Sequence, residues 1–193
     1  MAEPRLAEHA VDKLFIERTS PRSFTGEAIP DEVLFSMFEA ARWAPSASNI
    51  QPWRLIYAKA GSPQWSGLFD CLMPGNQVWV AKASALVAFV AETHRRQGET
   101  RAENRTHALD TGAAWMSLAL QAELLGWATH GMAGFHHDKA RAALALPEDF
   151  DVYMFAAIGK RAAAEALPPE LAAREVPSPR RHLAETVFLG RFG

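Results

Sequence analysis

The chain has 193 residues, and its 20 Lys and Arg against 22 Asp and Glu give a formal net charge of −2. Hydrophobic residues make up 49% of it and charged residues 22%, which is ordinary for a globular domain and excludes intrinsic disorder. The near-neutral charge gives no general attraction to nucleic acid. The longest apolar stretch, around residues 109–127, is interrupted by two acidic residues and a glutamine, so we expect no membrane span. The single Cys71 excludes an internal disulfide and fits a reducing compartment, so we expect one cytoplasmic domain over residues 1–193.

The first half of the chain is predicted to contain two helices and two strands. Residues 6–18 have apolar side chains on one helical face, and a turn with Pro21 follows them. Pro30 and Asp31 open a second amphipathic helix, which Pro45 ends. Residues 53–58 are predicted to form a strand. Residues 85–90 have no polar face, so they are expected to form a central strand that is covered on both sides.

The second half is predicted to begin with the longest helix, at about 103–125. This helix is apolar around more than one stripe, which is typical of a helix in a subunit interface, and we favour a homodimer. A short helix at 138–146 and a strand at 152–158 follow. The segment 168–193 is rich in Pro and Arg, yet it is apolar at 187–189, so it is expected to wrap over a partner subunit. The order of elements predicts an α/β or α+β sheet domain.

The common metal, hydrolase and nucleotide motifs are missing from the sequence. His107 with Asp110, and the residues 136–138, lack metal-ligand spacing and are better explained as solvated or capping residues. No Gly-x-Ser-x-Gly elbow and no Walker pattern occur. The stretch 131–134 has two glycines only, and it does not follow the first strand of a Rossmann unit. We therefore expect neither a metal ion nor a catalytic dyad.

Two basic clusters and one restricted loop remain. Arg18, Ser20 and Arg22 could bind a phosphate, because the guanidinium fork matches phosphate oxygens; a cation-favoured helix end is an equally good explanation from spacing alone. A second basic pair at 180–181 is equally ambiguous. The loop 45–53 combines two prolines, small side chains, Asn49 and Gln51. Such a loop is rigid and lets backbone groups approach a flat ligand, so we interpret it as a binding loop.

Taken together, these segments resemble the nitroreductase family of FMN-dependent oxidoreductases. The resemblance is carried by Arg-Thr-Ser-Pro-Arg-Ser-Phe at 18–24 and by Ala-Ala-Arg-Trp-Ala-Pro-Ser-x-x-Asn-x-Gln-Pro-Trp at 40–53. It continues through Asn76 and through the segments 110–114, 126–127, 131–135, 158–160 and 180–185, and thus spans nearly the whole chain. The order of the pieces and the Pro-Ser-x-x-Asn-x-Gln-Pro-Trp motif make it specific.

The resemblance implies an α+β fold with a mixed β-sheet flanked by helices, in an intertwined homodimer with a long central interface helix. Two FMN molecules would lie at the interface, each held by both subunits. The implied contacts are Arg18, Thr19, Ser20, Arg180 and Arg181 to the phosphate; Arg22 and Asn76 to the pyrimidine side; Met132, Ala133 and Gly134 to the ring; and Ser46, Ala47 and Asn49 from the partner, with Pro45 and Gln51 in the same loop.

The chain departs from the family pattern at two positions. Some nitroreductases have a lysine where this chain has Trp79, and some have a glutamate where it has Ala133. The first departure removes a positive charge near the flavin, which could lower the reduction potential or leave that work to Arg22 alone. The second changes the space or polarity beside the ring. We also expect Trp79 or a residue of 61–74 to reach the substrate pocket.

The resemblance implies that NAD(P)H reduces the bound FMN and that a nitroaromatic, a quinone or a similar flat acceptor is then reduced in its place, with ping-pong kinetics. No acid–base side chain is required. Three alternatives remain open: a non-catalytic FMN-binding or regulatory module, a flavin-destroying enzyme that forms dimethylbenzimidazole, and an α/β domain that binds another phosphate. The flavin-destroying group carries an acidic residue where this chain has Ser20.

Overall fold

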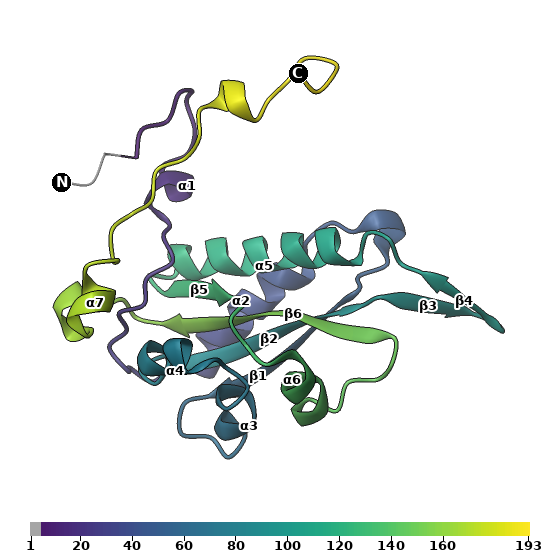
Figure 1. Ribbon diagram of the computed structural model, residues 1–193, viewed down its shortest axis with the longest axis horizontal. Helices are drawn as coiled ribbons and strands as arrows, with labels where there is room; N and C mark the ends of the chain where they lie inside the picture. Colours follow the sequence, from purple (N-terminus) through teal and green to yellow (C-terminus); the bar gives the residue numbers. More distant parts are fainter. Residues whose placement is uncertain (1–4) are drawn as a thin grey trace.

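The computed structural model describes residues 5–193 and is built around one four-stranded sheet (Figure 1). Its strands are β1 (Trp53–Lys59), β2 (Ala85–Glu92), β5 (Ala128–Met132) and β6 (Phe150–Gly159), in the order β1-β2-β6-β5. The α+β class is therefore confirmed. Each of these strands runs opposite to its neighbour, so the sheet that this single chain forms is antiparallel and not mixed as expected.

Helices cover both faces of the sheet. Helices α2 (Asp31–Arg42) and α5 (His107–Leu124) pack on one face, whereas α3 (Trp65–Phe69), α4 (Pro74–Val80) and α6 (His137–Ala143) cover the other (Figure 1). Strand β2 serves both layers because its side chains alternate: Val87 and Phe89 join the α2–α5 cluster, and Leu86 joins the opposite one. The prediction of a central strand at 85–90 covered on both sides is confirmed.

The first predicted helix is much shorter in the structure, and several elements were not predicted. Helix α1 spans Lys13–Glu17, and the Asp12 side chain caps it by accepting from the Leu14 amide at 2.8 Å. Residues 6–12 are not helical, because their apolar side chains have nothing to pack against; Leu6 is 83% exposed. The unpredicted elements include α3, α4, β5 and a hairpin of β3 (His94–Gln97) and β4 (Thr100–Glu103). The long helix predicted from 103 begins at His107, after this hairpin.

The two ends of the chain form arms that run together away from the sheet (Figure 1). Helix α7 (Pro169–Ala172) begins the C-terminal arm, which continues in an extended form past the N-terminal segment. The Glu8 carboxylate ties the arms by accepting from the Leu183 amide at 3.2 Å, and it lies 3.0 Å from His182 Nδ1. Leu189 and Phe192 are almost fully exposed, which is costly for large apolar side chains unless another surface covers them.

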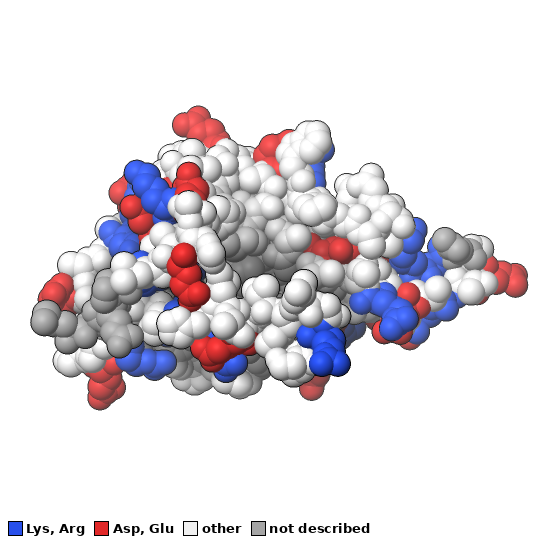
Figure 2. Space-filling model, turned by 90° about the horizontal axis from the view of Figure 1, so that it is seen from above, with Lys and Arg blue, Asp and Glu red and all other residues white. Residues whose placement is uncertain are grey.

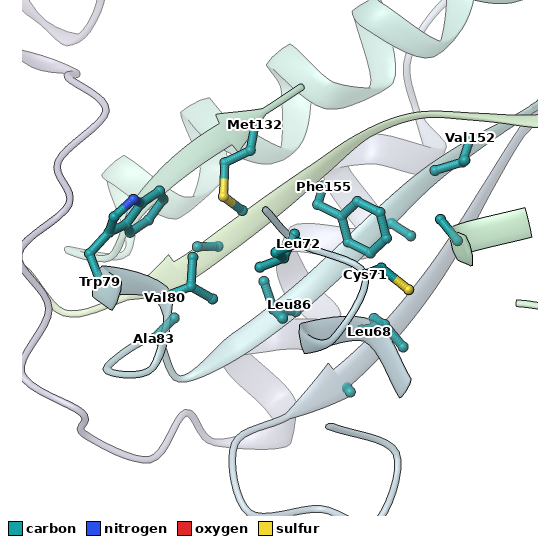
Figure 3. Packing of buried hydrophobic residues seen from close by; sticks show 14 of the residues in the cluster. Leu68, Cys71, Leu72, Trp79, Val80, Ala83, Leu86, Met132, Val152 and Phe155 are labelled. Atoms are coloured by element: carbon teal, nitrogen blue, oxygen red, sulfur yellow. The ribbon is translucent and has the colours of Figure 1, made fainter. Parts of the chain in front are cut away.

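The core beneath α4 corrects one expectation about the site. Trp79 is only 2% exposed and lies in the same hydrophobic cluster as Val80 and Met132 (Figure 3), with its ring centroid 6.1 Å from that of Phe24. The expectation that Trp79 reaches the substrate pocket is therefore wrong, because its aromatic ring is buried against other side chains in the core. Cys71 lies in the same core, where burial raises the pKa of its thiol. Among residues 5–193, no helix combines the length and apolar character that crossing a membrane requires.

Candidate functional site

The most distinctive feature of the surface is a cavity of about 450 Å³ lined by arginines. It lies between the loop after α1, the beginning of β5, the segment after β6 and the C-terminal arm. The sequence-predicted residues Arg18, Thr19, Ser20, Arg22 and Arg180 all line it, so the two basic clusters, separated by about 160 residues, meet in one place. The other polar and charged lining residues, which sequence reasoning missed, are Arg5, His130, Arg161, Arg174, Glu175 and Ser178.

The loop 18–22 has a fixed shape in this cavity. Arg18 donates from Nη1 to the Thr19 carbonyl at 3.1 Å and to Ser20 Oγ at 3.3 Å. Arg5 donates to the Arg18 carbonyl at 2.9 Å, which draws the N-terminal arm over the loop. His130 Nδ1 lies 3.1 Å from the Pro21 carbonyl and donates to it, so β5 and the loop are held together. The guanidinium groups are thus positioned in advance of any ligand.

The cavity has a strong positive charge, because arginines outnumber carboxylates among the described residues that line it. Burial and then repulsion from Arg180 lower the pKa of Arg18, while Glu123 acts in the opposite direction. The pKa of Arg5 is lowered by burial and then by Arg180 and Arg18. Burial first, and then Arg22, also lower the pKa of His130, which keeps that ring neutral. Such a group of arginines suits an anion with several oxygens, above all a phosphate.

A second predicted cluster lies further along β5. Asn76, on α4, donates from Nδ2 to the Gly134 carbonyl at 2.9 Å, and the Met73 amide donates to the same oxygen at 3.0 Å. Gly134 allows this approach, since a Cβ there would lie 2.6 Å from Asn76 Nδ2. Met132 is 4% exposed, while Ala133 is exposed. Strand β5 contributes His130 to the cavity and ends at Met132, so the Gly134–Asn76 cluster lies just past the end of the same strand.

The predicted binding loop at 45–51 is strained and anchored. Ser48, Asn49 and Gln51 have φ of 50°, 54° and 52°, in the left-handed region that side chains other than glycine rarely adopt. Gln51 donates from Nε2 to Asn49 Oδ1 at 3.0 Å, and its amide donates to Ser46 Oγ at 3.0 Å. Ala47 is exposed, as is Pro45. Strained backbone of this kind persists where the surrounding structure holds it and is concentrated at functional sites.

The buried carboxylate of Asp110 holds this loop on α5. Its Oδ2 accepts from the Ala47 amide at 3.2 Å and from Thr106 Oγ1 at 2.9 Å, and Asp110 is only 6% exposed. Asp110 is one of two acidic residues on the otherwise apolar α5, and this local pattern did not identify Ala47 as its partner. Among residues 5–193, no group of three His, Cys, Asp or Glu side chains is arranged to bind a metal ion.

The loop 45–51 and the arginine cavity lie at opposite ends of α5. Asp110 is in the first turn of this helix, and Glu123 is in its last turn, where it lies 3.9 Å from the cavity residue Arg161. Thirteen residues at about 1.5 Å each separate the two points by about 20 Å. One chain therefore does not bring the loop to its own cavity. Arg181 is exposed and is not among the cavity-lining residues.

Comparison with known proteins gives the class to which this arrangement belongs. The model of the nitroreductase family matches residues 16–64 and 62–160, and the chain therefore belongs to the nitroreductase family. This confirms the resemblance drawn from the motifs at 18–24 and 40–53.

Individual relatives give the same result. A solved structure described as an oxidoreductase containing FMN is 44% identical, covers 100% of this chain and 98% of its own, and has a TM-score of 0.96. A solved complex with FMN from Desulfovibrio desulfuricans is 26% identical over 94% of this chain and 96% of its own, with a TM-score of 0.71. An NADH dehydrogenase from Thermus thermophilus is 25% identical over 75% of this chain and 83% of its own length. The matches to relatives from Rhodopseudomonas palustris and Streptomyces coelicolor span slightly less than half of those proteins, 46% and 45%.

Proposed function

We propose that this protein is an FMN-dependent oxidoreductase that takes electrons from NAD(P)H and passes them to a flat acceptor. The observation that carries the proposal is the arginine cavity, which includes His130 of β5, together with the Gly134–Asn76 cluster just past the end of the same strand. We assign the cavity to the anionic phosphate of FMN and the cluster to its flat ring with hydrogen-bonding edges. The FMN in the similar solved proteins supports the same assignment.

At the phosphate end, the donor set fits a dianion. Arg18 and Arg180 line the cavity with no carboxylate within 4.0 Å in the described part of the chain, and Ser20 adds a hydroxyl. An anion that binds between them offsets their mutual repulsion, so a bound phosphate stabilises the folded protein. Arg181 is adjacent in sequence, and we propose that it closes over the phosphate from the arm.

At the ring end, backbone groups and Asn76 orient the ligand. The exposed Ala133 and the half-buried Gly134 present main chain at the end of β5, and Arg22 would lie toward the pyrimidine side. When bound, FMN supplies the two-electron chemistry that no amino-acid side chain provides. The protein then contributes binding, orientation and charge, which agrees with the absence of a catalytic dyad in the sequence.

A second copy of this chain would complete each site. The outer side of α5 exposes Leu109 at 76%, Met116 at 38% and Leu124 at 67%, in a stripe with helical spacing. Seen from the α5 side, the middle of the surface carries little charge (Figure 2). A homodimer packed on this stripe with its two α5 helices antiparallel would cover it and give the exposed arm 168–193 a surface to wrap. It would also bring the loop 45–51, which lies about 20 Å from its own cavity, to the cavity of the partner.

The shared site leads to a test by subunit complementation. Two inactive variants, Arg18→Ala in the cavity and Ala47→Trp in the exposed loop, are co-expressed with different tags, and the heterodimer is purified. If each site combines one cavity with the partner's loop, the heterodimer holds one intact site and binds one FMN per dimer, whereas each homodimer binds little. If one chain forms the whole site, the heterodimer holds no intact site, and the proposed arrangement is wrong.

The electron donor and acceptor are proposed from the class alone. NAD(P)H fits an open ring face, and once it leaves, a nitroaromatic, a quinone or a similar flat molecule would occupy the same place, which requires ping-pong kinetics. Initial rates measured over a matrix of donor and acceptor concentrations test this point: parallel double-reciprocal lines are expected, and intersecting lines would exclude a shared position.

A further inference from the structure

Among the described residues that line the cavity, Glu175 on the C-terminal arm carries the one carboxylate. Its side chain is only 9% exposed. Both of its oxygens accept from the Arg22 amide at 3.0 Å, and Oε1 lies 3.4 Å from Arg22 Nη1. A buried carboxylate is costly unless it is paired and hydrogen-bonded, and these contacts meet both conditions.

Glu175 divides the cavity into two electrostatically different ends. Arg18 and Arg180 have no carboxylate within 4.0 Å in the described residues, and their charges repel each other. Arg22, in contrast, is already balanced by Glu175. The positive charge at Arg18 and Arg180 is therefore uncompensated by a nearby carboxylate, while the positive charge at Arg22, assigned to the pyrimidine side, is reduced by Glu175.

The charge balance at Arg22 matters because Arg22 is the cation that we assign to the pyrimidine side, whereas the side chain of Trp79 is buried in the core. Reduction of a flavin by two electrons and one proton leaves a negative charge on its pyrimidine side, and positive charge nearby stabilises this reduced form more than the oxidised form. A carboxylate paired with Arg22 subtracts from that stabilisation.

From this geometry we infer that Glu175 is a positioning residue that lowers the affinity of the site for reduced FMN relative to oxidised FMN, by holding and partly neutralising Arg22. The inference rests on the proposed function and extends it to a residue outside the family motifs. It states that the reduction potential of the bound flavin is set in part from the C-terminal arm.

The same contacts permit a different role, in which Glu175 occupies the place of the ligand and is displaced by it. That role predicts that loss of the carboxylate strengthens the binding of both redox forms by the same factor. The ratio of the two affinities separates the two roles, because only a charge effect at Arg22 changes it.

The experiment compares Glu175→Gln with Glu170→Gln, an equal charge change at an exposed position of α7 in the same segment. The dissociation constant of oxidised FMN is measured by fluorescence quenching, and the potential of the bound flavin by anaerobic titration against a reference dye. In Glu175→Gln the ratio of affinities for reduced and oxidised FMN should rise about tenfold, which is about 30 mV for a two-electron couple. Glu170→Gln should leave the ratio within twofold of the wild type.

Two further variants keep the inference testable if Glu175→Gln does not fold. Glu175→Asp retains the charge and should keep the potential nearer to that of the wild type than Glu175→Gln does, whereas Arg22→Gln removes the cation and should shift the ratio in the opposite direction. An unchanged ratio in Glu175→Gln, or an equal change in both affinities, would overturn the inference. Wild-type protein that binds no FMN would instead overturn the proposed function, so the two failures are distinguishable.

Discussion

Replacing Arg18 by alanine tests the placement of the phosphate. Arg18 is half-buried in the cavity, and its own hydrogen bonds, at 3.1 and 3.3 Å, are long and remain within the loop 18–22. Its repulsion with Arg180 also disappears in Arg18→Ala. The free energy of unfolding should therefore change by only about 1 kcal/mol, because water can replace these local and partly exposed hydrogen bonds and the lost repulsion from Arg180 offsets part of their loss.

The affinity for FMN should fall much further. A charge-assisted hydrogen bond contributes about 1.5–3 kcal/mol, which corresponds to a roughly ten- to hundredfold increase in the dissociation constant. The other arginines of the cavity keep the loss toward the lower end of this range. Riboflavin, which has no phosphate, should bind wild-type protein and Arg18→Ala equally well.

Fluorescence titrations with FMN and riboflavin measure both quantities on the same samples. Lys139→Ala, which removes an exposed cation on α6, a helix that does not line the cavity, is the charge-matched control and should leave both affinities unchanged. The reasoning is refuted if FMN binds Arg18→Ala as tightly as the wild type, or if riboflavin binding weakens by the same factor as FMN binding.

Three more substitutions test other parts of the account. In Gly134→Ala the new Cβ would lie 2.6 Å from Asn76 Nδ2 and break the 2.9 Å hydrogen bond, so FMN and riboflavin should both bind about two- to tenfold more weakly; a loss confined to FMN would contradict the assignment of this end to the ring. Leu109→Arg places a charge on the exposed stripe of α5 and should convert dimers to monomers in light scattering, while an unchanged mass would argue against that interface. The pKa of His130 in the folded protein lies below its ordinary value of 6.5. As the pH falls, His130 is therefore protonated in the unfolded chain before it is protonated in the folded protein. The stability that the neutral ring contributes is present above pH 6.5 and is lost as the pH falls through the folded-state pKa. Urea unfolding across this range should show a shallower decline in His130→Gln than in the wild type, and parallel curves would disprove the buried neutral ring.

The sequence was sufficient to predict the elements with strong periodicity. The uninterrupted apolar run at 85–90 predicted the central strand β2, and the Pro-Asp start with apolar spacing predicted α2. Strand β5 was missed because Gly131 and His130 interrupt its apolar pattern, although its pairing with β6 decides its conformation. Helix α1 was predicted too long, because periodicity alone does not reveal that its apolar side chains at 6–12 have no partner in the chain.

The candidate site was predictable to the extent that local motifs define it. The motifs at 18–24 and 40–53 pointed in advance to the loop that lines the cavity and to the loop with left-handed backbone. Arg5, Arg174 and Glu175 were missed because each lies in a segment without periodicity and reaches the cavity only through the path of the arms. The role of Asp110 likewise depends on a contact with Ala47, 63 residues earlier in the chain, which no local pattern contains.

The central claim is that this protein holds FMN and receives electrons from a nicotinamide nucleotide. An absorption spectrum of the purified protein, reconstituted with FMN if necessary and then titrated anaerobically with NADH and NADPH, tests it most directly. The account predicts flavin bands that bleach with at least one donor and return unchanged when an acceptor is added. Bands that neither donor bleaches would indicate a binding module, and a flavin spectrum lost when oxygen is admitted after reduction would indicate a flavin-destroying enzyme. Protein that takes up no FMN would contradict the account altogether.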